Sequence, residues 1–197
     1  MKSAQFAQDQ KKADLQYYWD SYSSVNIHEQ MIKDYTRTHT YEKAITQCAI
    51  AGKVVLDVGC GLGILSLFAA RAGAKHVYAI ENAAIADKAI EIVRNNGYED
   101  VITVIKGRAE DIELPVDKVD IIVSEWMGYN LLYESMLGTV LYARDKWLVP
   151  GGLILPDKCH MYMFVPPSLC TLPSPFWGCF FGEKGRFHDA CNGTHPQ

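Results

Sequence analysis

The chain has 197 residues, of which 49% are hydrophobic and 21% are charged, and its formal net charge is −4. This composition is that of an ordinary globular protein, and it excludes a disordered, collagenous or low-complexity chain. The acidic balance predicts no nucleic-acid or membrane partner, and no apolar run reaches the roughly 18 residues of a membrane-spanning helix. The amino-terminal segment is polar where a secretory signal would be apolar, so we expect a cytosolic protein.

Helices are predicted near the amino terminus, after a flexible arm over residues 1–14. Asn26 and Glu29 have the spacing of a capping box, in which each side chain satisfies an unpaired amide at a helix start. A helix is therefore expected to begin after Asn26. A second helical stretch is expected over Thr40–Cys48.

From Lys53 onward, short apolar runs alternate with helical stretches. The predicted strands are 53–58, 76–80, 101–105, 119–123 and 153–155, and the predicted helices are 64–72, 83–95 and 135–148. Strands that are apolar throughout are typical of a parallel sheet buried on both faces. The alternation predicts an α/β fold with helices on both faces of that sheet.

A glycine turn follows the first predicted strand, with the pattern Gly59-x-Gly61-x-Gly63. Such a turn lets a ligand approach backbone amides at a helix start, although a tight turn alone would look the same. Glu81 ends the next strand, 22 residues after Gly59, where an acidic residue hydrogen-bonds a ribose diol. The dinucleotide fingerprint would need glycine where Ile64 stands, so a nicotinamide oxidoreductase is disfavoured and S-adenosylmethionine is favoured.

Glu110 follows the third predicted strand. It could accept a hydrogen bond from an adenine amino group, or it could be one carboxylate of an acidic loop. Seven carboxylates and one cation lie between Glu110 and Glu134. This acidity suits a cationic substrate as well as a solvated surface.

The segment Ser124–Glu134 places two glutamates around aromatic and apolar residues after the fourth strand. Glu125 and Glu134 would repel each other unless a cation lay between them. A guanidinium is planar and permanently charged and binds carboxylates with two hydrogen bonds, so the pattern predicts an arginine clamp. A metal site is the alternative, but no histidine accompanies the glutamates. The only other candidate ligands, Cys170, Cys179, His188 and Cys191, have no standard zinc spacing, so no metal is expected.

Long segments of the chain resemble the protein arginine methyltransferases, most closely their asymmetric-dimethylating (type I) branch. The resemblance lies in VLDVGCGLGILSLFAARAGA, the strand-ending Glu81, KGRAEDIELPVDKVDIIVSEWMGYNLLYESML and VLYARDKWLVPGGLILPD, and it covers roughly residues 15–160. It implies a Rossmann-like S-adenosylmethionine-dependent methyltransferase fold with amino-terminal helices that close over the cofactor.

The resemblance also implies site residues. Glu125 and Glu134 would be the catalytic pair that grips the substrate arginine. The cofactor-binding residues would be His28, Arg37, Gly59, Gly61, Glu81 and Glu110, with Arg37 pairing the methionyl carboxylate and Glu81 the ribose. Tyr22 and Met31 would pack against the cofactor and the active site, whereas periodicity alone would assign His28 and Met31 to a helix face.

The domain boundaries expected from the resemblance are 15–157 for the methyltransferase domain and 158–165 for the start of a β-barrel. Residues 166–197 hold five of the eight prolines and three of the six cysteines, and they form a divergent tail. Because family members continue into a barrel with a dimerisation arm and a Thr-His-Trp sequence, this chain resembles a truncated form. The barrel is expected to be largely absent and the family homodimer is not expected.

The function implied is methyl transfer to arginines of protein substrates, such as Gly/Arg-rich segments or histone tails, in the cytoplasm and nucleus. The alternative is a catalytically weak or inactive isoform that acts as an interaction partner of full-length methyltransferases.

Overall fold

The computed structural model describes residues 22–133 and 136–161. Contacts group residues 1–159 into one compact unit and residues 160–197 into another, and the elements below belong to the first. The domain boundaries predicted after residues 14, 157 and 165 remain predictions. No helix in the described ranges is long and apolar enough to cross a membrane.

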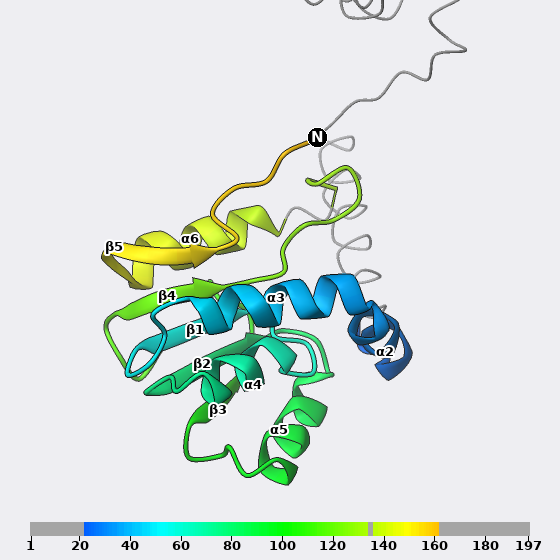
Figure 1. Ribbon diagram of the computed structural model, residues 1–197, viewed down its shortest axis with the longest axis horizontal. Coiled ribbons are helices and arrows are strands. Elements are labelled where there is room, and N and C mark those ends of the chain that lie inside the picture. The colour runs from blue at the N-terminus through cyan, green and yellow to red at the C-terminus, as the bar shows by residue number, and fades with distance from the viewer. Residues whose placement is uncertain (1–21, 134–135, 162–197) are drawn as a thin grey trace, which may run out of the picture. The chain divides into compact units, whose positions relative to one another are not determined.

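A five-stranded parallel sheet forms the centre of this unit (Figure 1). Its strand order is β3-β2-β1-β4-β5, and the strands are β1 (Val54–Val58), β2 (His76–Glu81), β3 (Ile102–Lys106), β4 (Val119–Val123) and β5 (Leu148–Leu155). The helices are α2 (Val25–Lys33), α3 (Tyr35–Gln47), α4 (Ile64–Arg71), α5 (Ala86–Asn95) and α6 (Leu137–Trp147). The predicted α/β fold with a parallel sheet is confirmed.

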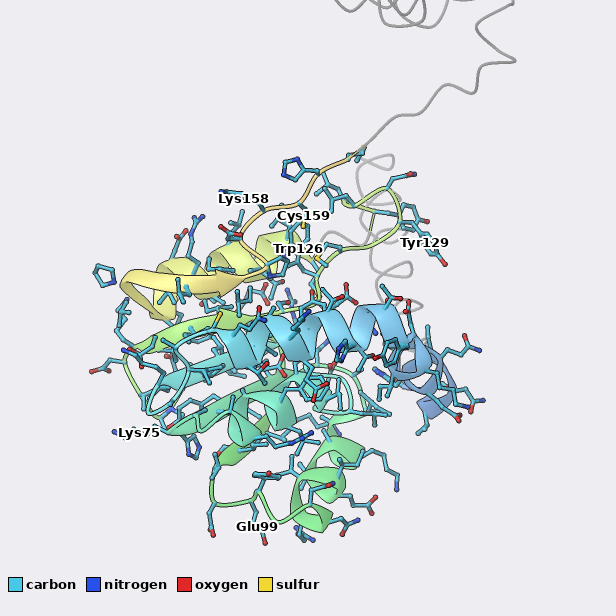
Figure 2. The ribbon with its side chains drawn as sticks, viewed as in Figure 1. Lys75, Glu99, Trp126, Tyr129, Lys158 and Cys159 are labelled. Atoms are coloured by element: carbon cyan, nitrogen blue, oxygen red, sulfur yellow. The ribbon has the colours of Figure 1, made fainter. Side chains whose placement is uncertain are left out.

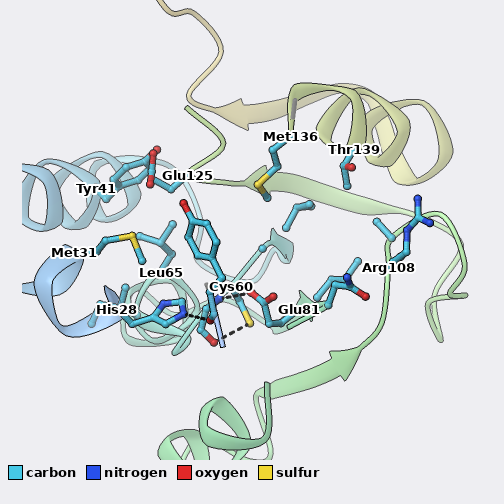
Figure 3. Close-up of a pocket in the computed structure, with 18 of the residues that line it drawn as sticks. His28, Met31, Tyr41, Cys60, Leu65, Glu81, Arg108, Glu125, Met136 and Thr139 are labelled. Carbon is cyan, nitrogen blue, oxygen red and sulfur yellow. Dashed lines mark hydrogen bonds between the residues drawn. The ribbon is translucent and has the colours of Figure 1, made fainter. Parts of the chain in front are cut away.

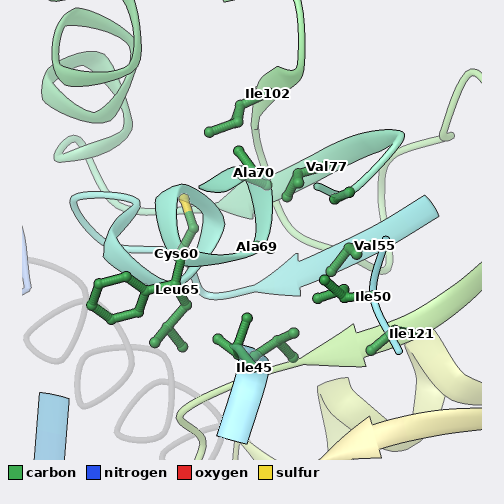
Figure 4. Packing of buried hydrophobic residues seen from close by; sticks show 14 of the residues in the cluster. Ile45, Ile50, Val55, Cys60, Leu65, Ala69, Ala70, Val77, Ile102 and Ile121 are labelled. Atoms are coloured by element: carbon green, nitrogen blue, oxygen red, sulfur yellow. The ribbon is translucent and has the colours of Figure 1, made fainter. Parts of the chain in front are cut away.

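Alternate residues of each strand enter two separate cores, one on each face of the sheet. On one face Val55 and Val77 pack with α3, α4 and α5, and Ile45 of α3 is completely buried there (Figure 4). On the other face Leu56 and its neighbours pack with Trp147 and the rest of the buried side of α6. The chain order of the strands reverses direction between β1 and β4, and ligands of open α/β sheets bind at such a point.

The amino-terminal helices differ in detail from the prediction. The α2 helix begins at Val25, and its N-cap is Ser24, whose hydroxyl accepts a hydrogen bond from the Asn26 amide at 3.3 Å. Asn26 therefore lies inside the helix, and the predicted capping box is wrong. The carboxylate of Asp34 caps α3 by accepting from the Arg37 amide at 3.0 Å, so this helix starts five residues before the predicted Thr40.

The last strand is longer than predicted. It follows α6 directly and runs through Pro150 and Gly151, which the sequence suggested as a break. A proline lacks an amide hydrogen, but an edge strand pairs on one side only and tolerates that loss. The β4–β5 pairing includes a register shift between Val119 and Ile121 that accommodates the irregular segment.

Candidate active site

A cavity of about 320 Å³ lies at the carboxyl edge of the sheet, beside the switch between β1 and β4. All seven predicted site residues in the described part of the chain line it: His28, Arg37, Gly59, Gly61, Glu81, Glu110 and Glu125. Tyr22 and Met31 line it as well. Met31, Tyr41 and Glu125 appear at one end of the cavity in Figure 3, and Arg108 and Thr139 at the other.

The glycine turn after β1 is built around Glu81. The Gly61 amide donates to Glu81 Oε2 and the Ala83 amide donates to Glu81 Oε1, both at 2.8 Å. Gly59 and Gly61 have φ angles of +74° and +56°, which favour glycine. Glu81 is only 7% exposed. Its carboxylate therefore shapes the turn, in addition to the ligand-binding role predicted for it.

The α2 helix closes over this turn through His28, which is buried. The ring nitrogen Nε2 of His28 lies 2.8 Å from the carbonyl oxygen of Tyr22, and the two rings meet edge to face. A Cβ atom added to Gly61 would lie 2.9 Å from the His28 ring. The turn and the helix therefore fit each other only because residue 61 is a glycine.

Asp57, the fourth residue of β1, is buried beneath the glycine turn. Its Oδ2 accepts a hydrogen bond from the Ser66 hydroxyl at 2.7 Å. Its Oδ1 has no hydrogen-bond partner among residues 22–133 and 136–161. Burial, helped by the nearby Glu81 charge and opposed by the Ser66 hydrogen bond, raises the pKa of this carboxyl to about 7.

Glu110 lies at the end of the cavity opposite Glu125. Its Oε1 accepts a hydrogen bond from the Thr139 hydroxyl of α6 at 2.8 Å, and Arg108 Nε lies 3.7 Å from Oε2. The sequence singled out Glu110 but neither Arg108 nor Thr139. Thr139 carries no local signal, because its part in the site depends on how α6 packs against the sheet.

Glu125 and Arg37 form an ion pair with Arg37 Nη2 at 2.5 Å from Glu125 Oε2. The two residues are 88 positions apart, and both side chains are mostly buried at the same end of the cavity. The predicted anion-binding residue of the cofactor site thus touches the predicted guanidinium-binding residue of the clamp. In this structure the guanidinium that Glu125 contacts is therefore that of Arg37.

Ser124 and Tyr41 fix the start of the segment Ser124–Glu134, called the glutamate loop below. Sequence reasoning assigned neither of them a role. The Ser124 hydroxyl donates to the Val58 carbonyl oxygen at 2.7 Å and so ties β4 to β1. The Tyr41 hydroxyl donates to the Ser124 carbonyl oxygen at 3.2 Å, and burial, followed by the Glu125 charge, raises the pKa of Tyr41. A signal for Tyr41 was its place on an otherwise polar helix, but its partner could not be inferred.

Trp126 anchors the glutamate loop, because its side chain is buried in the core that also contains α6. In contrast, Tyr129 and Tyr133 are 81% and 78% exposed (Figure 2 labels Tyr129). Asn130 and Leu131 have φ angles of +48° and +66°, an uncommon conformation that is costly for leucine. Glu134, the second predicted clamp residue, lies outside the described residues. The four candidate zinc ligands of the tail lie outside them too.

The acidic run after β3 is less concentrated than its sequence suggests. Five of its carboxylates form ion pairs. Glu110 and Asp111 pair with Arg108 of the same loop. The other three pair with cations from other elements, as Glu113–Lys146, Asp120–Lys53 and Glu125–Arg37. Of these carboxylates, Glu110 and Glu125 line the cavity. The charge that a cationic ligand would meet is therefore local to the cavity and is not a property of the whole run.

The fold and the site define a methyltransferase domain. A family model described as a methyltransferase domain matches residues 55–152, which include β1 through most of β5. The chain is similar to the PRMT1 enzyme–prozyme heterotetramer of Trypanosoma brucei with AdoHcy, with a TM-score of 0.67 and 55% identity over 70% of this chain and 44% of that one. It is also similar to Arabidopsis thaliana protein arginine methyltransferase 10, with a TM-score of 0.68 and 46% identity over 70% of this chain and 40% of that one.

The chain belongs to the protein arginine N-methyltransferase family. It is 59% identical over 183 residues to protein arginine N-methyltransferase 1 of Chlamydomonas reinhardtii, an alignment that covers 92% of this chain and 50% of the relative. It is 62% identical over 154 residues to the enzyme of the same name from Oryza sativa subsp. indica, covering 77% of this chain and 40% of the relative. The chain therefore spans about half or less of the length of these relatives.

Proposed function

We propose that this chain binds S-adenosylmethionine and transfers its methyl group to a guanidinium nitrogen of protein arginine residues. The observation that carries the proposal is that the described candidate residues all line one cavity, in a chain of this family. The cofactor class follows from the methyltransferase domain match and from the AdoHcy in the Trypanosoma brucei relative.

The residues of the cavity fit such a ligand. Its volume of about 320 Å³ lies in the usual range for small-molecule sites. At Gly61 the absence of a side chain leaves room for the His28 ring, which lines the cavity beside the glycine turn. Each oxygen of Glu81 has one amide donor and retains a second acceptor position, which a ribose hydroxyl could occupy.

In this proposal Arg37 binds the carboxylate of the amino-acid end of the cofactor and Glu110 receives the base at the opposite end. S-adenosylmethionine supplies an electrophilic methyl group on a sulfonium ion. Glu125, together with Glu134, would hold the substrate guanidinium and keep the attacking nitrogen in line with that methyl group. A nitrogen–carbon bond would form as the carbon–sulfur bond breaks and S-adenosylhomocysteine leaves, and the methylated guanidinium would release one proton to water. Alignment would supply most of the rate enhancement.

The substrates proposed are arginine-containing proteins with Gly/Arg-rich segments or histone-like tails, in the cytoplasm and nucleus. A cationic peptide suits the clamp because carboxylates bind guanidinium groups strongly, as the Glu125–Arg37 pair illustrates. No nucleic acid or membrane is needed as a partner in this proposal.

The experiment is radiolabelled methyl transfer from S-adenosylmethionine to a Gly/Arg-rich protein, with this chain as the sole catalyst. We expect Glu125→Gln to lower turnover by about 100-fold or more, because the amide keeps the shape but removes the charge opposite the guanidinium. The affinity for S-adenosylhomocysteine should not fall in this variant, because loss of the Glu125 charge leaves the Arg37 guanidinium available to the ligand carboxylate. Glu99→Gln is the matched control and should retain turnover, because Glu99 is exposed (Figure 2 labels it) and does not line the cavity.

The same assay tests the alternative of a non-catalytic interaction protein. The Trypanosoma brucei relative is an enzyme–prozyme heterotetramer, so assembly of an enzyme chain with a prozyme occurs in the family. If this chain binds S-adenosylhomocysteine but transfers no methyl group alone, and if it changes the turnover of an added full-length relative, the alternative replaces the proposal. Turnover that Glu125→Gln leaves unchanged would contradict the clamp.

A further inference from the structure

Ser124, the residue before Glu125, is held by three different elements. It is completely buried, and its amide, hydroxyl and carbonyl groups each have a partner. The amide donates to the Leu155 carbonyl oxygen of β5 at 3.0 Å, and the hydroxyl donates to the Val58 carbonyl oxygen of β1 at 2.7 Å. The carbonyl oxygen accepts from the Tyr41 hydroxyl of α3 at 3.2 Å. The sheet therefore fixes Ser124 from two sides, and α3 fixes its carbonyl group.

The carbonyl group of Ser124 belongs to the same peptide unit as the amide of Glu125. A peptide unit is planar, so a bond that fixes this carbonyl also fixes the direction in which the chain enters Glu125. The strand β4 ends at Val123, so this peptide unit lies where the chain leaves the sheet. The Tyr41 hydroxyl therefore holds the backbone at the point where it presents Glu125 to the cavity, which both residues line (Figure 3).

Tyr41 lies one helical turn after Arg37 on α3, so both side chains point to the same side of the helix. Arg37 contacts the Glu125 side chain, and Tyr41 contacts the backbone immediately before it. In the proposed function the Arg37 guanidinium turns to the ligand carboxylate and Glu125 turns to the substrate arginine. The Tyr41 hydroxyl needs no such change of partner, because its acceptor is a buried backbone group. It can therefore hold the backbone at Glu125 in place while the carboxylate exchanges partners.

The Tyr41 hydroxyl is suited to act as a permanent donor. A second contact, to Met127 Sδ at 4.0 Å, involves a weak acceptor, so the Ser124 carbonyl oxygen is the stronger partner. Burial, and then the Glu125 charge, raises the pKa of Tyr41, so the hydroxyl keeps its proton at neutral pH. Its removal would deprive a carbonyl group of a completely buried residue of this donor. Such a loss costs more than the loss of an exposed hydrogen bond.

We propose that Tyr41 is a positioning residue for methyl transfer: through the Ser124 carbonyl group it holds Glu125 in the orientation that aligns the substrate guanidinium. The inference rests on the proposed function, because it assumes that Glu125 binds this guanidinium. Tyr41 acts through Glu125 and not on the reacting atoms. Methyl transfer depends on alignment, so a small rotation of Glu125 lowers turnover while the guanidinium can still bind. The loss of the Tyr41 hydroxyl should therefore lower kcat more than it raises the KM for the protein substrate.

The test is a double-mutant cycle on the full chain, in which radiolabelled methyl transfer to a Gly/Arg-rich protein measures kcat and KM. Tyr41→Phe removes the hydroxyl and keeps the ring, and its effect is compared in the wild-type and the Glu125→Gln backgrounds. A purely structural role for Tyr41 would lower kcat equally in both backgrounds, whereas a role that acts through Glu125 would not. Titration of S-adenosylhomocysteine measures whether each variant keeps its cofactor site.

Two further substitutions isolate the hydroxyl. Incorporation of 4-aminophenylalanine in place of Tyr41 replaces the hydroxyl by an amino group that also donates. The matched control is Tyr35→Phe, because Tyr35 is on the same helix, is 73% exposed and does not line the cavity. If Tyr41→Phe does not fold, as judged by its circular dichroism, 4-fluorophenylalanine takes its place, because it fills nearly the same space as tyrosine and donates no hydrogen bond.

We expect Tyr41→Phe to lower kcat by about 10-fold, the scale of one buried hydrogen bond, and to change KM by less than about 3-fold. In the Glu125→Gln background it should lower kcat by less than about 3-fold, because the carboxylate that Tyr41 positions is gone. The 4-aminophenylalanine variant should recover most of kcat, and Tyr35→Phe should keep all of it. An unchanged kcat in Tyr41→Phe, the same loss in both backgrounds, or an equal loss of affinity for S-adenosylhomocysteine would overturn the inference while the proposed function stands. A wild-type chain that transferred no methyl group would overturn the proposed function, and the inference with it.

Discussion

At the scale of single residues, Glu81 and Asp57 show how buried carboxylates shape the turn beside the cavity. Glu81 accepts amide hydrogen bonds from Gly61 and Ala83, so its charge is compensated by the backbone that it organises. Asp57 has one hydroxyl partner and an Oδ1 atom without a partner among the described residues. The two carboxylates are close enough for the Glu81 charge to raise the pKa of Asp57. We therefore expect substitution of either residue to perturb the glycine turn as well as the binding of a ligand beside it.

The pKa of Asp57 makes stability depend on pH. Because burial raises this pKa from 3.8 to about 7, the folded state keeps a proton that the unfolded chain has lost. The contribution of Asp57 to stability is therefore present below about pH 4, is lost as the pH rises to about 7, and changes little above that. Asp57→Asn removes this titration while its amide oxygen can still accept from Ser66.

We expect the free energy of unfolding of Asp57→Asn, relative to that of the wild type, to rise as the pH increases from about 4.5 to about 7. Each unit of pH within the window corresponds to about 1.4 kcal/mol at most. Urea unfolding of both proteins at several pH values between about 4.5 and 8 measures the difference. Asp100→Asn, at an exposed turn, controls for the loss of one acidic group. Unfolding free energies that stay parallel across the range would show that Asp57 does not titrate there.

At the scale of elements, the cavity depends on the fit of α2 against the glycine turn. The two elements meet where the ring of His28 covers Gly61. The α3 helix then brings Arg37 to Glu125 and Tyr41 to Ser124. The amino-terminal helices therefore contact the segments that follow the carboxyl ends of β1 and β4. The helices thus complete a site whose other side the sheet provides.

We expect Gly61→Ala to weaken the binding of S-adenosylhomocysteine and to lower the free energy of unfolding by about 2–3 kcal/mol. Roughly 1 kcal/mol of this would come from placing alanine at a φ of +56°, and the rest from the contact of its Cβ with the His28 ring. Urea unfolding and ligand titration measure the two effects.

Gly52→Ala separates the two contributions. Gly52 has a similar φ of +73°, but a Cβ there would meet nothing within 4 Å. It should therefore show the backbone cost alone and leave ligand binding unchanged. In a second comparison, His28→Ala combined with Gly61→Ala should recover part of the unfolding free energy. Equal effects of Gly61→Ala and Gly52→Ala would argue against a tight fit of α2 to the turn.

At the scale of the whole described unit, one sheet serves two cores. Val55 faces the core under α3 and α4, and its neighbour Leu56 faces the core under α6. The central strands therefore contribute to both cores through adjacent residues, which couples the two faces of the sheet. We expect the unit to unfold as one cooperative structure.

Trp147→Ala tests this coupling. Trp147 is 2% exposed, and its removal should lower the free energy of unfolding by about 3–5 kcal/mol. Amide hydrogen exchange by mass spectrometry should show faster exchange in β1 and β2 and also in α4, on the opposite face. Tyr129→Ala, at a residue that is 81% exposed, is the control and should change stability by no more than about 0.5 kcal/mol. Faster exchange confined to α6 and β5 would indicate that the faces unfold independently.

Local sequence patterns were sufficient for the type and order of the central elements. Apolar runs predicted β1 and β4 because a strand buried on both faces has no polar alternation. The position of Glu81 at the end of β2 placed it near the glycine turn, because the carboxyl ends of neighbouring parallel strands meet at one edge. The patterns were less accurate at boundaries: they gave Asn26 as the cap where Ser24 acts, and they began the last strand at Leu153 where the structure begins it at Leu148.

By itself the sequence determined the strand–helix alternation, the glycine turn and the carboxylates that could face a ligand, because each depends on residues that are close along the chain. The tertiary structure alone decided which of these groups touch: Arg37 with Glu125, Tyr41 with Ser124, and Thr139 with Glu110. These pairs are separated by 29 to 88 residues. Their contacts depend on how helices pack across the sheet, and periodicity reports which side of a helix is buried but not which residue it meets there.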